Sequence, residues 1–449
     1  MGSLPPPLPL TDQIPDALDH PAAARFWLSV VLTGLGAGLG AVALTDLLEA
    51  VQHLAWPGPG TLADAASQAS VWRHLVVLAG AGLVTGAGQL ILTRLSSGNG
   101  IDITAAIWFS AGRLPAMRTL GSAVLSIVVV GMGVSLGREG APKQVGAVLA
   151  NACSDLGRLS DEQRRLLVAC GAGAGMAAAY GVPLGGALFA LEVLRGVLAL
   201  RLILPALLTA VIATGISWLL GMPNAPTYVI PAYPSPVSIS VWACLAGSAF
   251  GVVSVLYVRS IAWADRAKPQ GWRRCAAPVL IVGMLGVVSI WFPQLLGNGK
   301  DIADLAFMGR MGPGLLLVLL LLKPLATASC LGSGTPGGLF TPSLAMGALL
   351  GAVLGHAWTW MVPGGAPGAF AVVGAAAVLA ATTQGPISAV VLMTELTGQD
   401  RALVLPILLA VITATIVSRS IEPRSVYDAR LTDAEVASRI RSRDAPGHS

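Results

Sequence analysis

Long apolar runs, broken by short clusters of glycine, proline and charge, are the main pattern along this chain. Several runs approach the roughly 20 residues that a helix needs to cross a bilayer, and others are distinctly shorter. The runs include residues 26–48, 75–92, 120–136, 202–220, 241–257, 277–291, 314–322 and 403–417. Short runs interrupted by glycine indicate helices that end partway through the membrane.

The composition supports a membrane protein independently of any motif. The chain is 55% hydrophobic and 11% charged, and its mean hydropathy is +0.75. Average soluble domains carry roughly 25% charged residues, so a soluble fold of this length would lack the charge to solvate its surface. We therefore predict an all-α polytopic membrane protein.

The domain organisation is expected to be simple. Residues 1–24 form a proline-rich N-terminal segment without the features of a signal peptide. Residues 25–427 form one transmembrane domain, and residues 428–449 form a charged C-terminal tail that is too short for a separate domain.

Charge and cysteine usage exclude several classes of function. The five cysteines have no CxxC spacing and the histidines have no ligand spacing, so we expect no metal and no cofactor. The basic clusters, such as Arg164-Arg165 and Arg266 to Arg274, are interpreted as orientation signals of cytoplasmic loops. Nucleic-acid binding would need a basic face interleaved with aromatic residues, and the sequence contains none.

One short motif, Gly137-Arg138-Glu139-Gly140-Ala141-Pro142, places a carboxylate inside a long apolar region. An ionisable side chain at that depth is costly, so it marks a functional site by default. The glycines and the proline break the helix and leave backbone N–H groups that can bind an anion at a helix N-terminus. The motif therefore predicts a protein that handles anions and protons inside a membrane.

An internal repeat relates residues of about 25–222 to those of about 237–427. Three motifs recur in the same order at offsets of 199, 200 and 203 residues. They are Gly98–Ile103 with Gly297–Ile302, Gly137–Pro142 with Gly337–Pro342, and Pro183–Glu192 with Pro386–Glu395. Transporters built from two related halves bind substrate between the halves, at discontinuous helices. The two breaks, at 137–142 and 332–342, are thus the expected binding site.

These motifs resemble the CLC superfamily of chloride channels and proton-coupled anion antiporters. GREGAP resembles the family's GREGP element, GGLFTP (337–342) its GxFxP element, and Ser425-Val426-Tyr427 the segment with its central tyrosine. The resemblance extends from about Gly98 to Tyr427. It implies a CLC-type fold with two inverted repeats whose broken helices meet at the anion site, in a homodimer with one pathway per subunit.

The resemblance also implies a role for each residue of the site. Glu139 matches the gating and proton-coupling glutamate. Leu339 and Phe340 match positions whose backbone N–H groups line the anion site, and Tyr427 matches the tyrosine that closes its inner side. The expected anion-binding set is Asn99, Gly100, Arg138, Gly140, Leu339, Phe340, Thr341 and Tyr427.

Two positions depart from the chloride-transporting pattern. Asn99 stands where the chloride filter has a serine, and Val193 follows Glu192 where chloride antiporters carry a second, proton-transferring glutamate. Both changes resemble the fluoride-exporting branch of the superfamily. Fluoride is strongly hydrated, and an amide offers two N–H donors where a hydroxyl offers one.

Several of these residues also have simpler interpretations. Glu139 could cap a helix N-terminus, Asn99 could be only the turn residue of an Asn-Gly pair, and Tyr427 could anchor a helix end at the membrane interface. Arg138 either holds loop structure or steers anions, and Lys143 either concentrates anions or faces water. We expect Glu192 and Glu395 to be structural, because the repeat places them at equivalent positions.

The expected function is secondary active transport, with fluoride exported in exchange for protons across the cell (inner) membrane. A chloride/proton antiporter or a chloride channel of the same superfamily is the alternative. An intramembrane enzyme would need a nucleophile–base pair or a metal motif at membrane depth, and the sequence has no Ser/His or HExxH arrangement. A purely structural scaffold would leave the paired breaks and Glu139 unexplained.

Overall fold

The protein is described by a computed structural model that covers residues 21–95, 102–234, 236–398, 402–428 and 431. Most of the proline-rich segment and nearly all of the C-terminal tail lie outside these residues. Within the described ranges the chain forms helices and no β-strand, and one isolated β-bridge joins Gly137 to Gly338. The predicted all-α class is confirmed.

Among the described residues, the first half of the chain contributes nine α-helices and one π-helical turn. They are α1 (Pro21–Ala55), α2 (Leu62–Ser67), α3 (Val71–Leu95), α4 (Ile103–Phe109), α5 (Ala116–Gly131), α6 (Gly140–Leu156), α7 (Asp161–Tyr180), α8 (Pro183–Phe189), η1 (Ala190–Arg195) and α9 (Leu200–Leu219).

In the second half, the residues that the structure describes form eight α-helices and one 3-10 turn. They are α10 (Val237–Arg266), α11 (Arg273–Ser289), η2 (Pro293–Leu295), α12 (Lys300–Phe307), α13 (Pro313–Gly332), α14 (Phe340–Met361), α15 (Pro367–Thr383), α16 (Pro386–Thr397) and α17 (Val404–Ile421).

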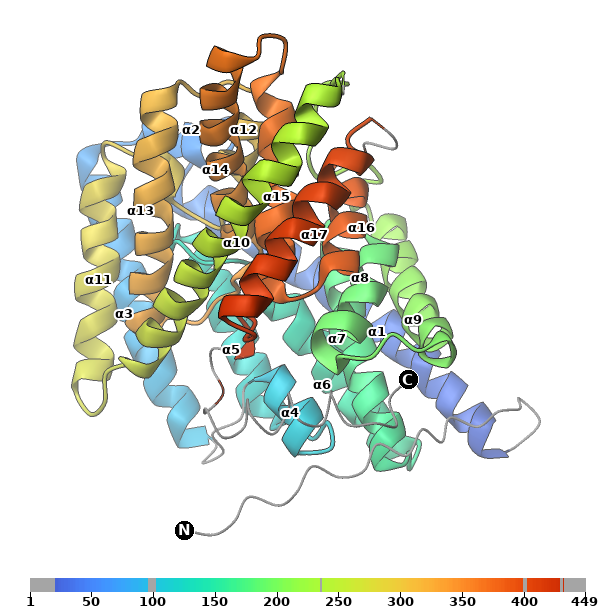
Figure 1. Ribbon diagram of the computed structural model, residues 1–449. Coiled ribbons are helices and arrows are strands. Elements are labelled where there is room, and N and C mark those ends of the chain that lie inside the picture. Colours follow the sequence, from blue (N-terminus) through green and yellow to red (C-terminus); the bar gives the residue numbers. More distant parts are fainter. Residues whose placement is uncertain (1–20, 96–101, 235, 399–401, 429–430, 432–449) are drawn as a thin grey trace.

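The two halves repeat the same series of helices. The series from α3 to α9 corresponds in order to that from α11 to α17, and the long helix α1 corresponds to α10. Helices α10 and α17 cross the front of the bundle side by side, as α1 and α9 pack together in the first half (Figure 1). Equivalent elements also meet across the halves, α3 with α11 and α8 with α16. Such self-complementary contacts are what a two-fold relation produces.

Seven of the described helices are long and apolar enough to cross a membrane: α1, α3, α9, α10, α13, α14 and α17. Helices α4, α8, α12 and α16 are only 7 to 12 residues long, which is too short to cross a bilayer. The prediction of full spans mixed with broken helices is therefore confirmed.

One helix ends earlier than the apolar run that predicted it. The apolar run 120–136 continues past the end of α5 at Gly131, and residues 132–139 form an irregular segment instead. Gly133 adopts a φ of 106°, a left-handed conformation that favours glycine and ends regular helix. Apolar composition extends the run, but this backbone conformation ends the helix and leads the chain to Glu139.

Close helix packing in both halves depends on glycines at matching positions. A Cβ on Gly146 in α6 would lie 1.9 Å from the carbonyl oxygen of Gly171 in α7. In the second half, a Cβ on Gly347 in α14 would lie 2.6 Å from the carbonyl oxygen of Gly374 in α15. Small residues let these helix backbones approach closely, and this packing holds α6 and α14 firmly at their N-terminal ends.

Candidate anion-transport site

The two helix breaks are joined by their backbones. Gly137 and Gly338 exchange both hydrogen bonds, with N–H to O distances of 2.8 Å and 2.7 Å. The bridge places the start of α6, at Gly140, beside the start of α14, at Phe340. Each helix start carries N–H groups that have no partner within their own helix, together with a partial positive charge, so the junction favours an anion.

A carboxylate from the chain itself occupies this junction. Glu139 is 0% exposed, and its Oε1 accepts a hydrogen bond of 2.6 Å from the N–H of Phe340. Its Oε2 accepts a bond of 3.3 Å from the Thr341 hydroxyl. Glu139 makes no such bond at the start of its own helix. The side chain therefore caps the helix of the other half, not its own.

Two glycines leave the space that this carboxylate fills. A Cβ on Gly137 or on Gly338 would lie 2.2 Å from Glu139 Oε1. Both contacts are closer than real Cβ atoms show, so a side chain at either position would displace the carboxylate. Glycine at these two positions is thus a requirement of the site and not only of the helix break.

Thr341 connects the carboxylate to Tyr180 and Arg138. The Tyr180 hydroxyl lies 3.0 Å from Thr341 Oγ1, and the Arg138 guanidinium lies 5.1 Å from the Tyr180 ring centroid. Because Thr341 has one proton and donates it to Glu139, Tyr180 donates its own proton to Thr341. Through its contact with Tyr180, Arg138 therefore adds positive charge next to the Glu139–Thr341 pair.

The predicted residues Leu339, Gly140 and Tyr427 border a cavity of about 510 Å³ that reaches the junction. The Tyr427 ring packs edge-on against Phe189 at 5.7 Å, and Phe189 packs edge-on against Phe340 at 6.4 Å. The structure thus brings the predicted tyrosine and the two predicted amide positions to one place.

The far part of this cavity is lined by the loop that joins α10 to α11. Lys268 of that loop borders the cavity, together with Asp265 and Arg266 at the end of α10 and Arg274 at the start of α11. Basic loops lie on the cytoplasmic side under the positive-inside rule. By this rule we expect the cavity to face the cytoplasm, and we call it the inner cavity.

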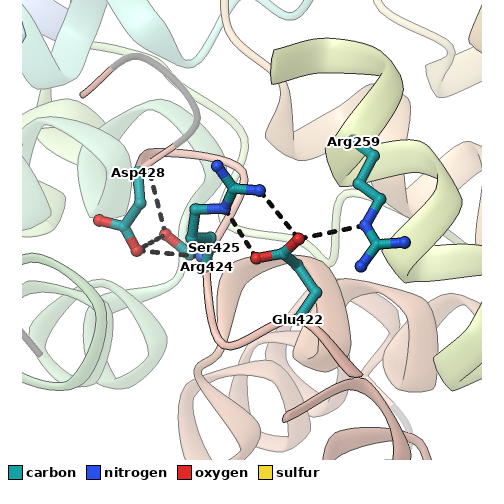
Figure 2. Close-up of polar contacts among 5 residues, drawn as sticks. All are labelled: Arg259, Glu422, Arg424, Ser425 and Asp428. Carbon is teal, nitrogen blue, oxygen red and sulfur yellow. Dashed lines mark hydrogen bonds and ion pairs between the residues drawn. The ribbon is translucent and has the colours of Figure 1, made fainter. Parts of the chain in front are cut away.

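A polar network after the end of α17 holds the segment that carries Tyr427 (Figure 2). Glu422 pairs with Arg424 at 2.7 Å and with Arg259 of α10 at 3.1 Å. Ser425 donates its N–H and hydroxyl to Asp428, at 3.0 Å and 2.7 Å. The Arg424 hydrogen bonds, together with the one from Arg259, hold the pKa of Glu422 below its usual value. These contacts set the position of Tyr427 from both sides.

Glu192 and Glu395 form a reciprocal pair of helix caps. Glu192 accepts from the N–H groups of Ile387 and Ser388 at 3.1 Å and 2.6 Å, at the start of α16. Glu395 accepts from Leu184 and Gly185 at 3.0 Å and 2.6 Å, at the start of α8. These hydrogen bonds agree with the structural role expected for both residues.

Two predicted filter residues, Asn99 and Gly100, lie outside the described residues, so their roles stay predictions. The second-half twin Asn298 uses its side chain in a turn, where Oδ1 accepts from the Lys300 N–H at 3.1 Å. Val193 is buried in η1 and offers no titratable group.

Some residues of the site were not predicted from sequence. Tyr180 carries no local signal, because its partner Thr341 is 161 residues away. The Arg259–Glu422–Arg424 network likewise joins distant segments. Lys143 had a signal, a cation within an apolar stretch, and it is only 5% exposed, so it does not simply face water. Among the described residues, no group of three His, Cys, Asp or Glu side chains could hold a metal ion.

Comparison with known proteins identifies relatives of the whole domain. The model of the voltage gated chloride channel family matches residues 80–419. A voltage-gated ClC-type chloride channel, ClcB, from Citrobacter koseri is 32% identical over 409 residues, which covers 87% of this chain and 95% of that protein. An H⁺/Cl⁻ exchange transporter, ClcA, from Vibrio campbellii is 31% identical over 71% of this chain and 70% of that protein.

Solved structures share the fold at lower sequence identity. A slow cyanobacterial Cl⁻/H⁺ antiporter has a TM-score of 0.78 at 22% identity, over 95% of this chain and 99% of its own. A CLC-type fluoride/proton antiporter has a TM-score of 0.74 at 21% identity, over 91% and 98%. This likeness confirms the predicted fold class, an all-α polytopic membrane protein with two inverted repeats and broken helices.

Proposed function

The chain belongs to the voltage-gated chloride channel family, and from that premise we propose that it is a proton-coupled anion antiporter that exports fluoride. Family membership confirms the resemblance inferred from the GREGAP and GGLFTP motifs. Members of this family are channels and transporters, so the expectation that the chain is not an enzyme is also confirmed.

One observation carries the proposal of antiport. The Glu139 carboxylate accepts the 2.6 Å hydrogen bond from Phe340 N–H at the place where two helix starts converge. An ionised carboxylate and a halide need the same N–H donors, so only one of them occupies the junction at a time. Hydrogen bonds to a charged group contribute about 1.5–3 kcal/mol, which makes the competition strong.

Coupling follows from this competition. When Glu139 takes up a proton, it loses the charge that holds it at the Phe340 amide, and an anion takes the place. When the anion leaves, the carboxylate returns after it has released its proton. Proton uptake by Glu139 and binding of the anion both favour the state in which the Glu139 side chain has left the junction, so the movements of the two ions are coupled.

The choice of fluoride rests on two sequence positions. Asn99 replaces the filter serine of the chloride pattern, and Val193 replaces its second proton-transferring glutamate. A solved relative of the same fold is a fluoride/proton antiporter. Chloride/proton exchange is the second candidate, because the relatives at 31–32% identity are named as chloride proteins.

The setting of the proposal is a multi-pass protein of the bacterial inner membrane that works as a homodimer. The seven long apolar helices and the family support the membrane. Light scattering of the protein in detergent, corrected for bound detergent, is expected to give twice the chain mass of 45.6 kDa. A single-chain mass would remove the homodimer from the proposal.

The decisive experiment is reconstitution in liposomes. Fluoride and chloride efflux are recorded with ion-selective electrodes, with and without a pH gradient. We expect fluoride flux to exceed chloride flux by a wide margin, and an imposed fluoride gradient to move protons in the opposite direction. Chloride-favouring or equal flux with proton movement would establish the second candidate, and anion flux without proton movement would exclude antiport.

A further inference from the structure

Lys143 lies one helical turn after Glu139 in α6, and its side chain ends in an ammonium group. The backbone N–H of Lys143 donates to the backbone carbonyl of Glu139 at 3.5 Å in the first turn of α6, so the two residues are four apart on one helix. Residues at this spacing share a helix face. The Glu139 side chain reaches the start of α14, whereas the Lys143 side chain borders the inner cavity.

The ammonium is held by two aromatic residues of the site. Lys143 Nζ lies 3.4 Å from the Tyr427 hydroxyl and 4.6 Å from the centroid of the Tyr427 ring. It lies 5.1 Å from the centroid of the Phe189 ring. Cation–π contacts of this kind stabilise a cation that is largely removed from water. The tyrosine predicted to close the inner side of the anion site is therefore in contact with a lysine.

The inner cavity leads from the basic α10–α11 loop to these groups. Lys143 and Tyr427 border it together with Gly140 and Leu339, at the starts of α6 and α14. A helix start carries about half a positive charge, whereas an ammonium carries a full one. Beside the amide junction, an anion in this cavity therefore meets a full positive charge at Lys143 in addition to the partial charges of the helix starts.

We propose that Lys143 binds the transported halide directly on the inner side of the Glu139 junction, with the Tyr427 hydroxyl as its neutral co-donor. This inference rests on the proposed anion transport and adds a specific charged residue to it. The ammonium helps to replace the hydration that the halide loses on entering the site. It acts before Glu139 is displaced, so it sets halide affinity and not proton coupling.

The test compares halide binding by isothermal titration calorimetry in detergent, with fluoride and chloride titrated separately. Lys143→Met and Lys143→Gln remove the charge, and Lys143→Arg keeps it. Loss of one close charged contact of about 1.4 kcal/mol weakens binding about tenfold, so we expect at least that change in the neutral variants. Two neutral variants are used so that a folding defect in one leaves the comparison intact. The arginine variant is expected to stay near wild-type affinity.

Lys268→Met is the matched control, because Lys268 borders the same cavity but forms an ion pair with Asp265. Its halide affinity should equal that of the wild type. A second control repeats Lys143→Met in a Tyr427→Phe background. If Lys143 acted only by positioning the Tyr427 hydroxyl, it would have no effect there, and that result would overturn direct binding.

Two further results would also overturn the inference. Wild-type halide affinity in folded Lys143→Met and Lys143→Gln would remove the direct contact. Loss of halide-driven proton movement with unchanged affinity would make Lys143 a proton carrier instead. Failure of the wild type to move protons would refute antiport but leave the binding comparison intact, so the two proposals fail separately.

Discussion

Two pairs of equivalent positions in the halves of this protein behave in opposite ways. Glu192 caps α16 and Glu395 caps α8, so each half gives a carboxylate to the other and receives one in return. At the anion junction, Glu139 caps α14, but its second-half equivalent is Leu339, which has no carboxylate to return. The repeat thus preserves the backbone of the junction and changes its chemistry.

In this fold of two related halves, function arises where the halves differ. A reciprocal pair satisfies both helix starts permanently and gives stability. A one-sided pair leaves the start of α6 without a carboxylate from the other half, while the start of α14 has a removable one. The one-sided pair therefore creates a site at which an anion can exchange with a side chain.

The largest expected effect tests the removable carboxylate. Glu139→Gln keeps the shape of the side chain but cannot ionise or carry a proton, so a fluoride gradient should no longer move protons. We expect a fall in proton flux of more than about 100-fold, since a positioned proton-transfer group commonly contributes that much. The measurement is the fluoride-driven pH change in sealed vesicles. Proton movement that survives would contradict this mechanism and direct attention to Glu192.

A second change crowds the carboxylate without removing it. Gly338→Ala places a Cβ 2.2 Å from Glu139 Oε1, so the carboxylate should leave the Phe340 amide. Overpacking costs about 1–3 kcal/mol, which corresponds to roughly a 5- to 150-fold shift away from the occupied state. We expect the ratio of protons to anions moved to fall in the liposome assay. Gly215→Ala in α9 is the control, because nothing lies within 4 Å of its added Cβ. An unchanged ratio in Gly338→Ala would mean that Glu139 does not need this space.

The asparagine twins extend the comparison to the filter. Asn99→Ser restores the hydroxyl of the chloride pattern, and we expect the fluoride-to-chloride flux ratio to fall on the order of tenfold for one lost donor to a charged ligand. Asn298→Ser is the matched control, since Asn298 is occupied by its own turn. Equal flux ratios in both variants would reduce Asn99 to a turn residue.

The reciprocal caps should affect stability and not coupling. Glu192→Gln and Glu395→Gln each weaken a charged cap of about 1 kcal/mol, so both should lower the melting temperature by a few degrees. Glu192 should matter more, because it also accepts a hydrogen bond of 2.6 Å from the Ser388 hydroxyl. Thermal unfolding followed by size-exclusion chromatography measures this. A loss of proton coupling in either variant would place that carboxylate in the transport path.

The smallest expected effect concerns Glu422, a carboxylate in the second half of the chain that pairs with Arg424 and Arg259. Its pKa is lowered by Arg424 and Arg259, so the stability it contributes is complete above its ordinary pKa of about 4.3. That contribution is lost as the pH falls through the lower pKa of the folded state. The melting temperature of the wild type should therefore fall more steeply below pH 4.3 than that of Glu422→Gln. Parallel profiles would show that the network in Figure 2 contributes no pH-dependent stability.

Local pattern was sufficient to predict much of this molecule. Apolar run lengths indicated full spans and broken helices, and glycine and proline placed the breaks near Gly140 and Phe340. The position of Glu139 inside a long apolar region identified it as a functional residue. The constant offset of about 200 residues predicted the two halves, whose matching helices are observed. These features depend on neighbours in the chain, so they are encoded locally.

Which distant groups meet depends on tertiary packing. The Glu139 carboxylate binds an amide 201 residues away, and Lys143 contacts a tyrosine 284 residues away. The end of α5 at Gly131 likewise depends on a segment that pairs with the other half. Such contacts follow from the relative position of two packed halves, which depends on glycine contacts between helices and not on any spacing within one segment. The amino-acid sequence supplies the groups present at the anion junction, and the packing of the two halves decides which of them bind one another.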